Sequence, residues 1–496
     1  MNPWQRVQRR GLNHWLPTYV AEAPSRRTAR AARRGRTTHL MFLVCDHFEP
    51  RHGVRDETQI DARLQAWGDG FGRLQQWCAA EFGTRPLHTW FYPPHHGDRA
   101  FSYLPGWVYE GLGEAELHYH HHGDTEATFR AALRTCLDTY ARHGLLLESG
   151  ERPSTRFGFV HGDWALDNSC HGRFCGVNGE LSILAEHGCW GDFTMPSSNE
   201  CQTRKINSIY YAIDSRERSK SHDWGRDARV GQADPPGFWL MQGPIGLRWD
   251  RSWRPRIENA SLTTLNWGSP DRIESWIDCN VHVHGRPEWL FIKLHTHGAI
   301  ERDFDALFGE RARTMHRLLN TRYNDGQRYK LHYVTARQAY NIAKAAEHGL
   351  HGDPQKYLDY RIQPPALRLY QVSAQHELLC CTRSRLHLRT VDSGCDVQAQ
   401  MRVGPISMVG GAWSELVADS EARTLRLLDT RRGGGARLVR LRPAAGCAFD
   451  TGIPVQSDGT AELRPEPGQG LLVQADTDGR LQIRQLSIGQ NADGST

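Results

Sequence analysis

Residues 39–49 read His-Leu-Met-Phe-Leu-Val-Cys-Asp-His-Phe-Glu, a short apolar run followed at once by acidic and imidazole side chains. An apolar run of this length, ended abruptly by polar residues, is typical of a strand that is buried on both faces. Acidic and imidazole groups directly beyond such a strand can bind a metal or carry protons, although a capped turn would use the same residue types. The segment therefore predicts the opening strand of an α/β fold, with chemistry at its carboxyl end.

The chain downstream alternates between strand and helix signals. Apolar residues recur at helical spacing from Ile60 to Trp77, although three glycines interrupt the pattern. A second helix is expected to begin after Thr125 and to stop at Gly144. Further strands are expected within residues 156–160, 189–195, 289–295 and 329–334, with helices near 180–187 and 335–348. Alternation of this kind predicts βα units and a mostly parallel sheet.

The sequence changes character near Pro364 and Pro365, after which short alternating strands are separated by turn dipeptides. We expect three segments: residues 1–37 as a basic, disordered arm, residues 38–362 as a β/α domain, and residues 367–496 as a β-sandwich. The sandwich could be an accessory module of a carbohydrate-active protein or a lid that covers one face of the first domain.

Charge is distributed unevenly along the chain. The net charge is +5, but residues 1–36 hold nine Arg and one Glu, which leaves −3 for the remainder. Such an arm could bind anionic lipid head groups, or it could simply be solvated. We find no nucleic-acid motif, no transmembrane segment and no secretory leader in the sequence, and we expect a cytoplasmic protein.

Twelve cysteines are scattered through the chain. In a reducing compartment they are more often small core residues than disulfides. Cys170 and Cys175 have nearly zinc-like spacing, but no second pair lies at the spacing of a zinc ribbon. We therefore expect buried thiols here rather than a metal site.

Residues 116–124 read Glu-Leu-His-Tyr-His-His-His-Gly-Asp, with four histidines in five positions where a strand gives way to a helix. His118 and His122 can converge on one cation across this turn, while His120 or His121 points elsewhere. The alternative is a run of surface histidines. The density of imidazoles favours metal binding.

Three more polar segments follow predicted strands. Residues 161–168 combine the flat apolar face of Trp164 with hydrogen-bonding groups on Asp163, Asp167 and Asn168, a mixture that suits a sugar ring. Residues 191–198 bring Asp192 and several hydroxyl groups. His295 and His297 follow a very apolar strand, where one histidine can act as a general acid.

The order of these motifs resembles the NodB-homology polysaccharide deacetylases of carbohydrate esterase family four, within the glycoside hydrolase/deacetylase superfamily. The likeness covers roughly residues 38–350. His118 to His122 match that family's His-(Ser/Thr)-x-x-His motif in spacing, with Tyr119 in place of Ser or Thr, and residues 292–295 match its last motif. The resemblance implies a distorted (β/α) barrel with a C-terminal all-β domain.

The resemblance also implies residue roles. Asp46, His118 and His122 would be metal ligands, and His295 would protonate the leaving amine. The family's first motif has two adjacent Asp, whereas here Asp46 stands alone beside His47. The general base is thus open between Asp163 and Asp192, and His47 is a further candidate for base or ligand. Sugar contacts would come from Trp164, Asn168 and His297.

Together these features predict a hydrolase that removes N-acetyl groups from an amino-sugar glycan or its precursor in polysaccharide biosynthesis. Zinc is the expected cofactor, because two histidines and one carboxylate leave room for water. One alternative is a glycosidase of the same superfamily that uses Asp163 and Asp192. Another is a non-catalytic glycan-binding or scaffold protein.

Overall fold

The computed structural model describes residues 10–148, 154–250 and 252–364, and residues 370–487 with short gaps. The chain divides into two compact units. The first is Met1–Cys136 with Arg156–Ile362, and the second is Leu137–Thr155 with Gln363–Thr496. Among the described helices, none is long and apolar enough to cross a membrane.

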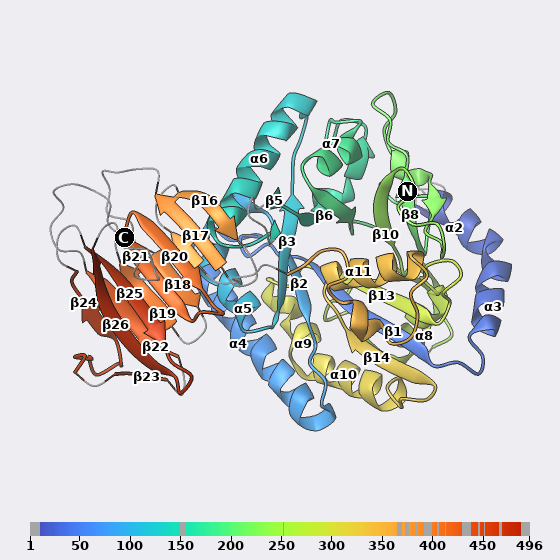
Figure 1. The fold of residues 1–496 in the computed structure, drawn as a ribbon. Helices are drawn as coiled ribbons and strands as arrows, with labels where there is room; N and C mark the ends of the chain where they lie inside the picture. Colours follow the sequence, from blue (N-terminus) through green and yellow to red (C-terminus); the bar gives the residue numbers. More distant parts are fainter. Residues whose placement is uncertain are drawn as a thin grey trace. The chain divides into compact units, whose positions relative to one another are not determined.

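The first unit is built on a ten-stranded sheet (Figure 1). Its main path runs β13-β1-β2-β3-β6-β7-β10-β8-β9, and β14 also pairs with β1. The pairs from β13 to β10 are parallel, whereas β8 pairs antiparallel with β10 and with β9. The strands are β1 (Thr38–His47), β2 (His88–Tyr92), β3 (Gly113–Tyr119), β6 (Phe157–His161), β7 (Cys189–Asp192), β8 (Ser208–Ala212), β9 (Arg226–Asp227), β10 (Phe238–Gln242), β13 (Trp289–Thr296) and β14 (Tyr329–Tyr333).

The packing of strand β1 explains why its sequence is almost entirely apolar. Met41, Leu43 and Cys45 face a core that also receives side chains from β6, β7, β8, β10 and β13, so the sheet curves around this core. Leu40 and Phe42 face the opposite core, which is covered by helices. The sequence prediction of a mixed α/β fold with a parallel-strand sheet is confirmed. The hydrogen-bonded order does not return to β13 among the described strands, so a closed barrel stays a prediction.

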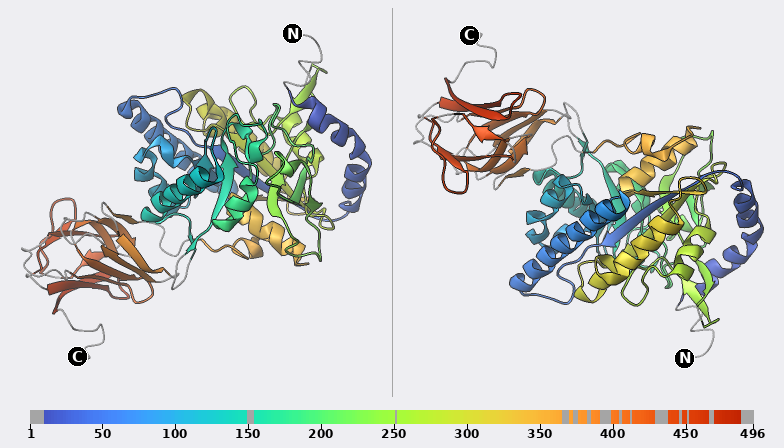
Figure 2. Two further views of the ribbon diagram at one scale, coloured as in Figure 1. Left: turned by 90° about the horizontal axis from the view of Figure 1, so that it is seen from above. Right: turned by 90° about the horizontal axis from the view of Figure 1, so that it is seen from below.

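Helices pack along this sheet, and α4 and α10 lie side by side (Figure 2). The predicted helix from Ile60 onward is α4, which continues through all three glycines. A Cβ at Gly68 would lie 2.4 Å from the Trp107 ring, and one at Gly70 would lie 2.4 Å from the Phe308 ring, so close packing requires glycine there. The helices are α4 (Glu57–Phe82), α5 (Leu104–Tyr109), α6 (Glu126–Arg142), α7 (Glu180–Glu186), α8 (Pro270–Cys279), α9 (Phe304–Leu307), α10 (Glu310–Arg322) and α11 (Ala336–Glu347).

Two helix boundaries follow the sequence signals. Helix α6 begins immediately after Thr125, as predicted. Helix α11 begins after Thr335, whose hydroxyl accepts a hydrogen bond from the backbone N–H of Gln338, while the Gln338 side chain accepts from the Thr335 N–H. This reciprocal capping box satisfies two backbone donors that a helix start otherwise leaves unpaired.

The N-terminal segment differs from the disordered arm that its charge predicts. Its described part forms α2 (Leu12–Ala21) and α3 (Ala23–Ala32). Trp15 is fully buried in a small core with Ile206 and Ile245. Burial of this indole outweighs the polarity of the surrounding sequence, because a large aromatic ring is among the strongest apolar anchors in a protein.

The second unit contains two β-sheets with a shared apolar core, to which Leu388 and Leu416 contribute from one sheet and Ile406 and Leu441 from the other. One sheet has the order β15-β18-β19-β22-β24 and the other β16-β17-β20-β21-β25-β26-β23; all pairs are antiparallel except β23 with β26. The strands are β4 (Leu147–Glu148), β5 (Ser154–Thr155), β15 (Tyr370–Val372), β16 (His376–Cys381), β17 (Arg385–Thr390), β18 (Ala399–Val403), β19 (Ile406–Gly411), β20 (Glu415–Asp419), β21 (Thr424–Leu428), β22 (Val439–Pro443), β23 (Ala448–Phe449), β24 (Ala461–Leu463), β25 (Gln469–Ala475) and β26 (Arg480–Ser487).

Candidate active site

Polar side chains gather where the parallel strands of the first unit end. Glu49 follows β1, His118 is the penultimate residue of β3, and His295 lies near the end of β13. Because β13, β1, β2 and β3 are consecutive parallel neighbours, their carboxyl ends meet at one edge of the sheet. Ligands of open α/β sheets bind at this edge.

Glu49, His118 and His120 form the centre of this cluster. One ligand atom from each lies within 4.8 Å of the others. Glu49 Oε1 lies 2.8 Å from His120 Nε2 and 4.0 Å from His118 Nε2. Glu49 and His118 are buried, and His120 is partly exposed. Two imidazoles and one carboxylate with access from one side are the ligand set of an open zinc site.

Hydrogen bonds fix the rings in the orientation that a cation requires. His118 Nδ1 donates to the Val160 carbonyl at 2.7 Å, and its Nε2 is buried without a hydrogen-bond partner in the described part of the chain. His120 Nδ1 lies 3.2 Å from Asp163 Oδ2. A histidine that donates from one ring nitrogen presents the lone pair of the other, which is how metal-binding histidines are oriented. The residues present therefore fit a divalent metal.

Burial and their mutual contacts shift the pKa values of all three groups. Burial alone would raise the pKa of Glu49, but the hydrogen bond with His120 and the adjacent histidines hold it well below its usual range. Burial, followed by the proximity of His120, lowers the pKa of His118 far below its ordinary value. Burial also opposes the charged form of His120, but Asp163 and Glu49 outweigh it and raise the pKa of His120 to about 9.

Aromatic rings surround this centre. The His47 ring lies 4.9 Å from that of His118, 5.0 Å from that of His297 and 5.3 Å from that of Trp164, measured between centroids. His47 Nε2 is buried and has no hydrogen-bond partner among the described residues. Burial and four neighbouring histidines lower the pKa of His47 well below its normal value. His47 is therefore a neutral imidazole beside the three candidate ligands.

His295 lies on the other side of His47, with 6.1 Å between the ring centroids. Its Nε2 donates to the Asn259 carbonyl at 3.0 Å, and its buried Nδ1 has no partner in the described structure. Burial, aided by Lys293 and His297, lowers the pKa of His295 to about 3. The ring is thus neutral near pH 7 and carries a lone pair on Nδ1, whereas the sequence analysis expected a protonated acid.

A cavity of about 210 Å³ opens beside these rings. It is lined by Trp164, His295, His297 and several hydroxyl and amide side chains, among them Ser197, Asn199 and Asn259. One flat aromatic face with many short polar groups suits a sugar ring better than an apolar ligand.

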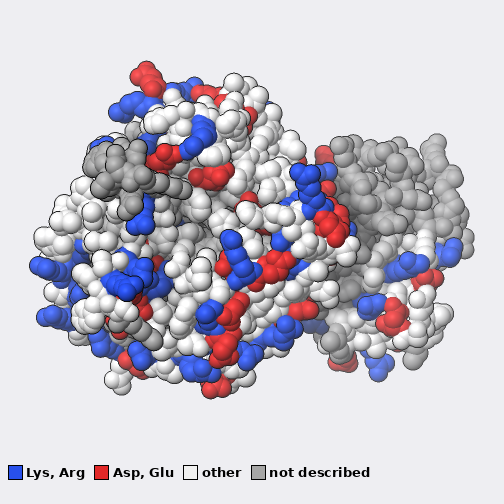
Figure 3. All heavy atoms as spheres, turned by 180° about the vertical axis from the view of Figure 1, so that it is seen from behind, with Lys and Arg blue, Asp and Glu red and all other residues white. Residues whose placement is uncertain are grey.

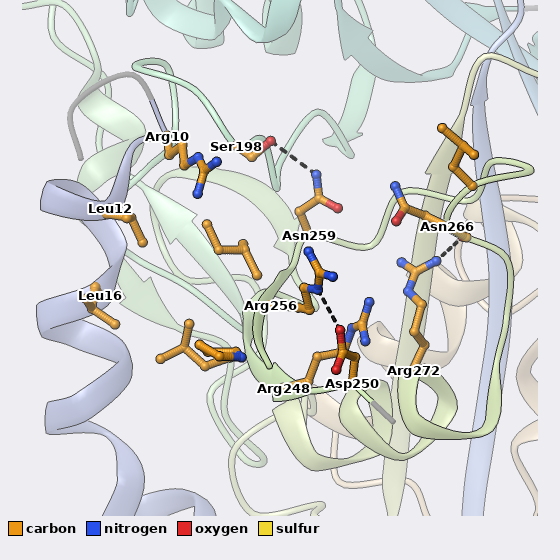
Figure 4. Close-up of a pocket in the computed structure, with 14 residues that line it drawn as sticks. Arg10, Leu12, Leu16, Ser198, Arg248, Asp250, Arg256, Asn259, Asn266 and Arg272 are labelled. Atoms are coloured by element: carbon orange, nitrogen blue, oxygen red, sulfur yellow. Dashed lines mark hydrogen bonds and ion pairs between the residues drawn. The ribbon is translucent and has the colours of Figure 1, made fainter. Parts of the chain in front are cut away.

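Two larger hollows border this cavity. One, of about 770 Å³, shares Ser198 and Asn259 with it, and the other, of about 790 Å³, shares Trp164 and Asn199. In Figure 4, Arg10, Leu12 and Leu16 of the N-terminal segment line one side of the first hollow. The N-terminal helix thus forms a wall of the groove in which the small cavity lies.

The arginines of this first hollow are largely neutralised. Arg256 pairs with Asp250 at 2.8 Å (Figure 4), Arg248 pairs with Asp271 at 2.6 Å, and Arg272 pairs with Glu258 at 2.5 Å. Lysine, arginine and carboxylate side chains also intermingle on the face drawn in Figure 3. These three ion pairs reduce the positive charge that the hollow presents to a ligand, while Arg10 also lines it.

The structure separates two of the predicted metal ligands from His118. Asp46 is fully buried; its Oδ2 lies 2.9 Å from His88 Nε2, and its Oδ1 accepts the Gly298 N–H at 2.6 Å. His122 is exposed and accepts the Phe174 N–H at 3.1 Å. Among the described residues, the group around His118 that could hold a metal ion contains Glu49 and His120 but neither Asp46 nor His122.

Of the other residues predicted for the site, some lie beside it and others do not. Asp163 reaches the site through His120, whereas Asp192 is buried and accepts two hydrogen bonds from Thr194, at 2.6 Å and 3.0 Å. Burial raises the pKa of Asp192 to about 7. Asn168 donates to Asn178 and accepts from Gly172, so both of its polar atoms hold the loop. Trp164 and His297 line the cavity, and their contact with a sugar stays a prediction.

Sequence reasoning missed Glu49 and His120 as ligands, although both stand in motifs that it selected. Extended backbone places residues i and i+2 on the same side, so His118 and His120 share a face without any turn. That period-two signal was present in the sequence. Glu49 carried no comparable signal, because its position depends on how the chain leaves β1.

Comparisons with known proteins were made for the chain as a whole. Neither the scan of protein-family models nor the search of curated proteins found a match. Among solved structures, a "putative polysaccharide deacetylase" from Mycobacterium smegmatis aligns with a TM-score of 0.34 and 16% identity, covering 64% of this chain and 94% of that one. A GH57 branching enzyme from Thermococcus kodakaraensis aligns with a TM-score of 0.28 and 12% identity, covering 59% of this chain and 69% of that one. Both TM-scores are too low to establish a shared fold.

Proposed function

We propose that this protein is a metal-dependent hydrolase that removes N-acetyl groups from an amino-sugar glycan. The observation that carries the proposal is the Glu49, His118 and His120 cluster, with the unpartnered His118 Nε2 beside a polar cavity that contains Trp164. The motif resemblance stated above supports the reaction class. Zinc is the metal that this donor set favours.

Each of these residues would have a separate role in the reaction. Glu49, His118 and His120 would hold the cation, and Asp163 would keep His120 in the correct orientation through its Nδ1. When bound, a divalent cation polarises a carbonyl oxygen and makes water more acidic. His295, neutral and with an Nδ1 that has no hydrogen-bond partner among the described residues, would be the proton carrier: it would accept a proton from the attacking water and return it to the departing amine.

The groove supports a polymeric rather than a monomeric substrate. The small cavity has room for one sugar unit, and the two hollows that border it have room for neighbouring units. The ion pairs of the first hollow are compatible with a neutral chain. The substrate class that best fits these features is an oligomer or polymer of N-acetylated amino sugars.

The glycosidase alternative requires two carboxylates on either side of the scissile bond. Asp163 is close to the cavity, but Asp192 is buried against Thr194 and is not among the cavity-lining residues. The pair proposed from the sequence therefore does not flank the cavity.

The test is an assay of acetate and of reducing ends on N-acetylglucosamine oligomers, with zinc-loaded wild type, with chelated protein and with His118→Ala. His143→Ala, at the residue that follows the C-terminal end of α6, serves as the matched histidine control. We expect acetate release from wild type and control, and its loss after chelation or in His118→Ala. New reducing ends without acetate would establish the glycosidase instead, and no turnover of any acetylated glycan would contradict an enzyme of this class.

A further inference from the structure

A second group of metal-ligating side chains lies apart from the cluster of Glu49, His118 and His120. His121, His161, Cys175 and Glu180 each place one ligand atom within 4.8 Å of the others. His121 follows β3, His161 ends β6, Cys175 lies in the following loop and Glu180 begins α7. All four residues are buried.

The distances among these atoms are those of a coordination sphere. His121 Nε2 lies 2.8 Å from His161 Nε2, and Glu180 Oε1 lies 3.3 Å and 3.4 Å from the same two nitrogens. Nitrogen and oxygen ligands at about 2.0–2.1 Å from a tetrahedral zinc ion lie roughly 3.3 Å from one another. Small adjustments of one imidazole would bring the three atoms to this spacing.

Outer hydrogen bonds aim both rings inward. His121 Nδ1 lies 3.0 Å from Asp124 Oδ2, and His161 Nδ1 donates to the Gly162 carbonyl at 2.5 Å. When both Nδ1 atoms carry hydrogen, both Nε2 atoms of the neutral rings present lone pairs to each other at 2.8 Å. This contact is repulsive unless a proton or a metal cation lies between the two nitrogens, and the Glu180 carboxylate beside them would neutralise either one. Carboxylate and carbonyl partners of this kind are the usual outer shell of metal-bound histidines.

Hydrogen bonds also position the remaining two proposed ligands, Glu180 and Cys175. Glu180 Oε2 accepts the Asp167 N–H at 2.6 Å, which leaves Oε1 toward the histidines, buried and without a hydrogen-bond partner among the described residues. Cys175 Sγ accepts the Val177 N–H at 3.4 Å and, as a thiol, donates toward Glu180 Oε2 at 3.8 Å, so the sulfur is held beside the carboxylate. An unpaired buried carboxylate oxygen is costly, and a bound cation removes that cost.

We propose that His121, His161, Cys175 and Glu180 bind a structural zinc ion that is separate from the proposed catalytic metal. Four protein ligands and complete burial leave no position for water or substrate, which distinguishes a structural site from a catalytic one. The mixed set of two nitrogens, one sulfur and one oxygen suits zinc, a borderline ion that accepts all three.

The ion would organise the loop that completes the active site. Asp163, which orients His120, and Trp164, which lines the cavity, lie between His161 and Cys175 and have φ angles of 53° and 55°. Such left-handed conformations persist in non-glycine residues only when surrounding structure holds them. Metal bonds at both ends of this stretch would supply that restraint, because His161 precedes it and Cys175 follows it.

The test exploits the thiolate, since the catalytic cluster contains no cysteine. Cobalt(II)-substituted protein should show a thiolate-to-cobalt charge-transfer band in the near ultraviolet. Cys175→Ser should abolish this band, whereas Cys279→Ser, a buried cysteine elsewhere in the unit, and His118→Ala should retain it. Elemental analysis should give two zinc ions per wild-type chain and one in each of Cys175→Ser and His118→Ala.

Two outcomes would overturn the proposal: a band that survives in Cys175→Ser, or zinc content that is equal in Cys175→Ser and wild type. Should Cys175→Ser fail to fold, zinc-edge X-ray absorption of His118→Ala decides the question. That variant retains only the proposed structural ion, and we expect one sulfur neighbour at about 2.3 Å. An X-ray absorption spectrum without a sulfur neighbour would refute the proposed structural zinc site. Loss of the catalytic metal alone would not contradict it.

Discussion

Glu49 Oε1 lies 2.8 Å from His120 Nε2, and this contact joins the end of β1 to the segment that follows β3. The contact identifies Glu49 as the carboxylate of the proposed catalytic metal. Glu49→Gln should lower turnover at least 100-fold and weaken metal binding, because an amide oxygen is a poorer ligand than a carboxylate. Acetate release and zinc titration measure both effects. Glu57→Gln, an exposed site at the start of α4, should leave both unchanged.

Substitution of Asp46 should lower stability rather than metal binding. Its carboxylate is paired with His88 and with the Gly298 N–H, so Asp46→Ala leaves buried polar groups unsatisfied. We expect the free energy of unfolding to fall by about 3–5 kcal/mol. The folded variant should still bind the metal. Denaturant titration and elemental analysis separate the two properties, and loss of metal with unchanged stability would restore Asp46 as a ligand.

Trp15 should anchor the N-terminal helices. Because its indole is fully buried with Ile206 and Ile245, Trp15→Ala should destabilise the protein by about 3 kcal/mol. Val20→Ala, at an exposed position of the same helix, should have little effect. Deletion of residues 1–36 should also lower the melting temperature, in contrast to the disordered arm that the charge predicts. An unchanged melting temperature in Trp15→Ala would show that the helix is dispensable.

His316 should make stability depend on pH. Burial lowers its pKa to about 3, while the unfolded chain titrates near 6.5. Between these values the unfolded state binds a proton that the native state does not, so stability falls as the pH is lowered from 6.5 toward 3. His316→Gln should reduce the slope of unfolding free energy against pH by about 1.4 kcal/mol per unit. Equal slopes in denaturation series of the two proteins would contradict this assignment.

Trp164 should contribute to substrate affinity more than to chemistry. Trp164→Ala removes the flat face of the cavity, and we expect KM for the oligomer to rise roughly tenfold, equivalent to about 1.4 kcal/mol. Trp224→Ala, an exposed tryptophan that does not line the cavity, is the control. A fall in kcat with unchanged KM would argue that Trp164 acts on the reacting groups instead.

Local sequence signals predicted much of the first unit. Strand β1, helix α4 and the capped helix α11 follow from apolar periodicity and cap residues, because these signals depend on neighbours along the chain. The helices α2 and α3 were missed because their stability depends on the distant partners of Trp15. The second unit's paired antiparallel sheets fit the expected alternation, and their function stays open.

The site was predicted less completely than the fold, because it depends on the path of the chain beyond each strand. The sequence identified the strand ends that carry His118, Trp164, His295 and His297, but it could not show how each chain turns beyond its strand. Asp46 lies within β1, whereas the positions of Glu49, His120 and His122 depend on the path that the chain takes after its strand. Cys170 and Cys201 form a disulfide, although the cysteines were expected as unpaired core residues. Pairing across 31 residues leaves no local pattern.

The run from His118 to His121 has a consequence for how this sequence tolerates change. His118 and His120 turn to the proposed catalytic ion, and His121 turns to the proposed structural one, so alternate positions serve different centres. Deletion of Tyr119 would move His121 and His122 into positions 120 and 121, so each ligand position of both proposed centres would still hold an imidazole. Insertion of one residue after Tyr119 would instead leave position 120 without a histidine, while position 121 would keep one. The run of consecutive histidines therefore protects both proposed centres against the loss of Tyr119 but not against the gain of a residue before His120.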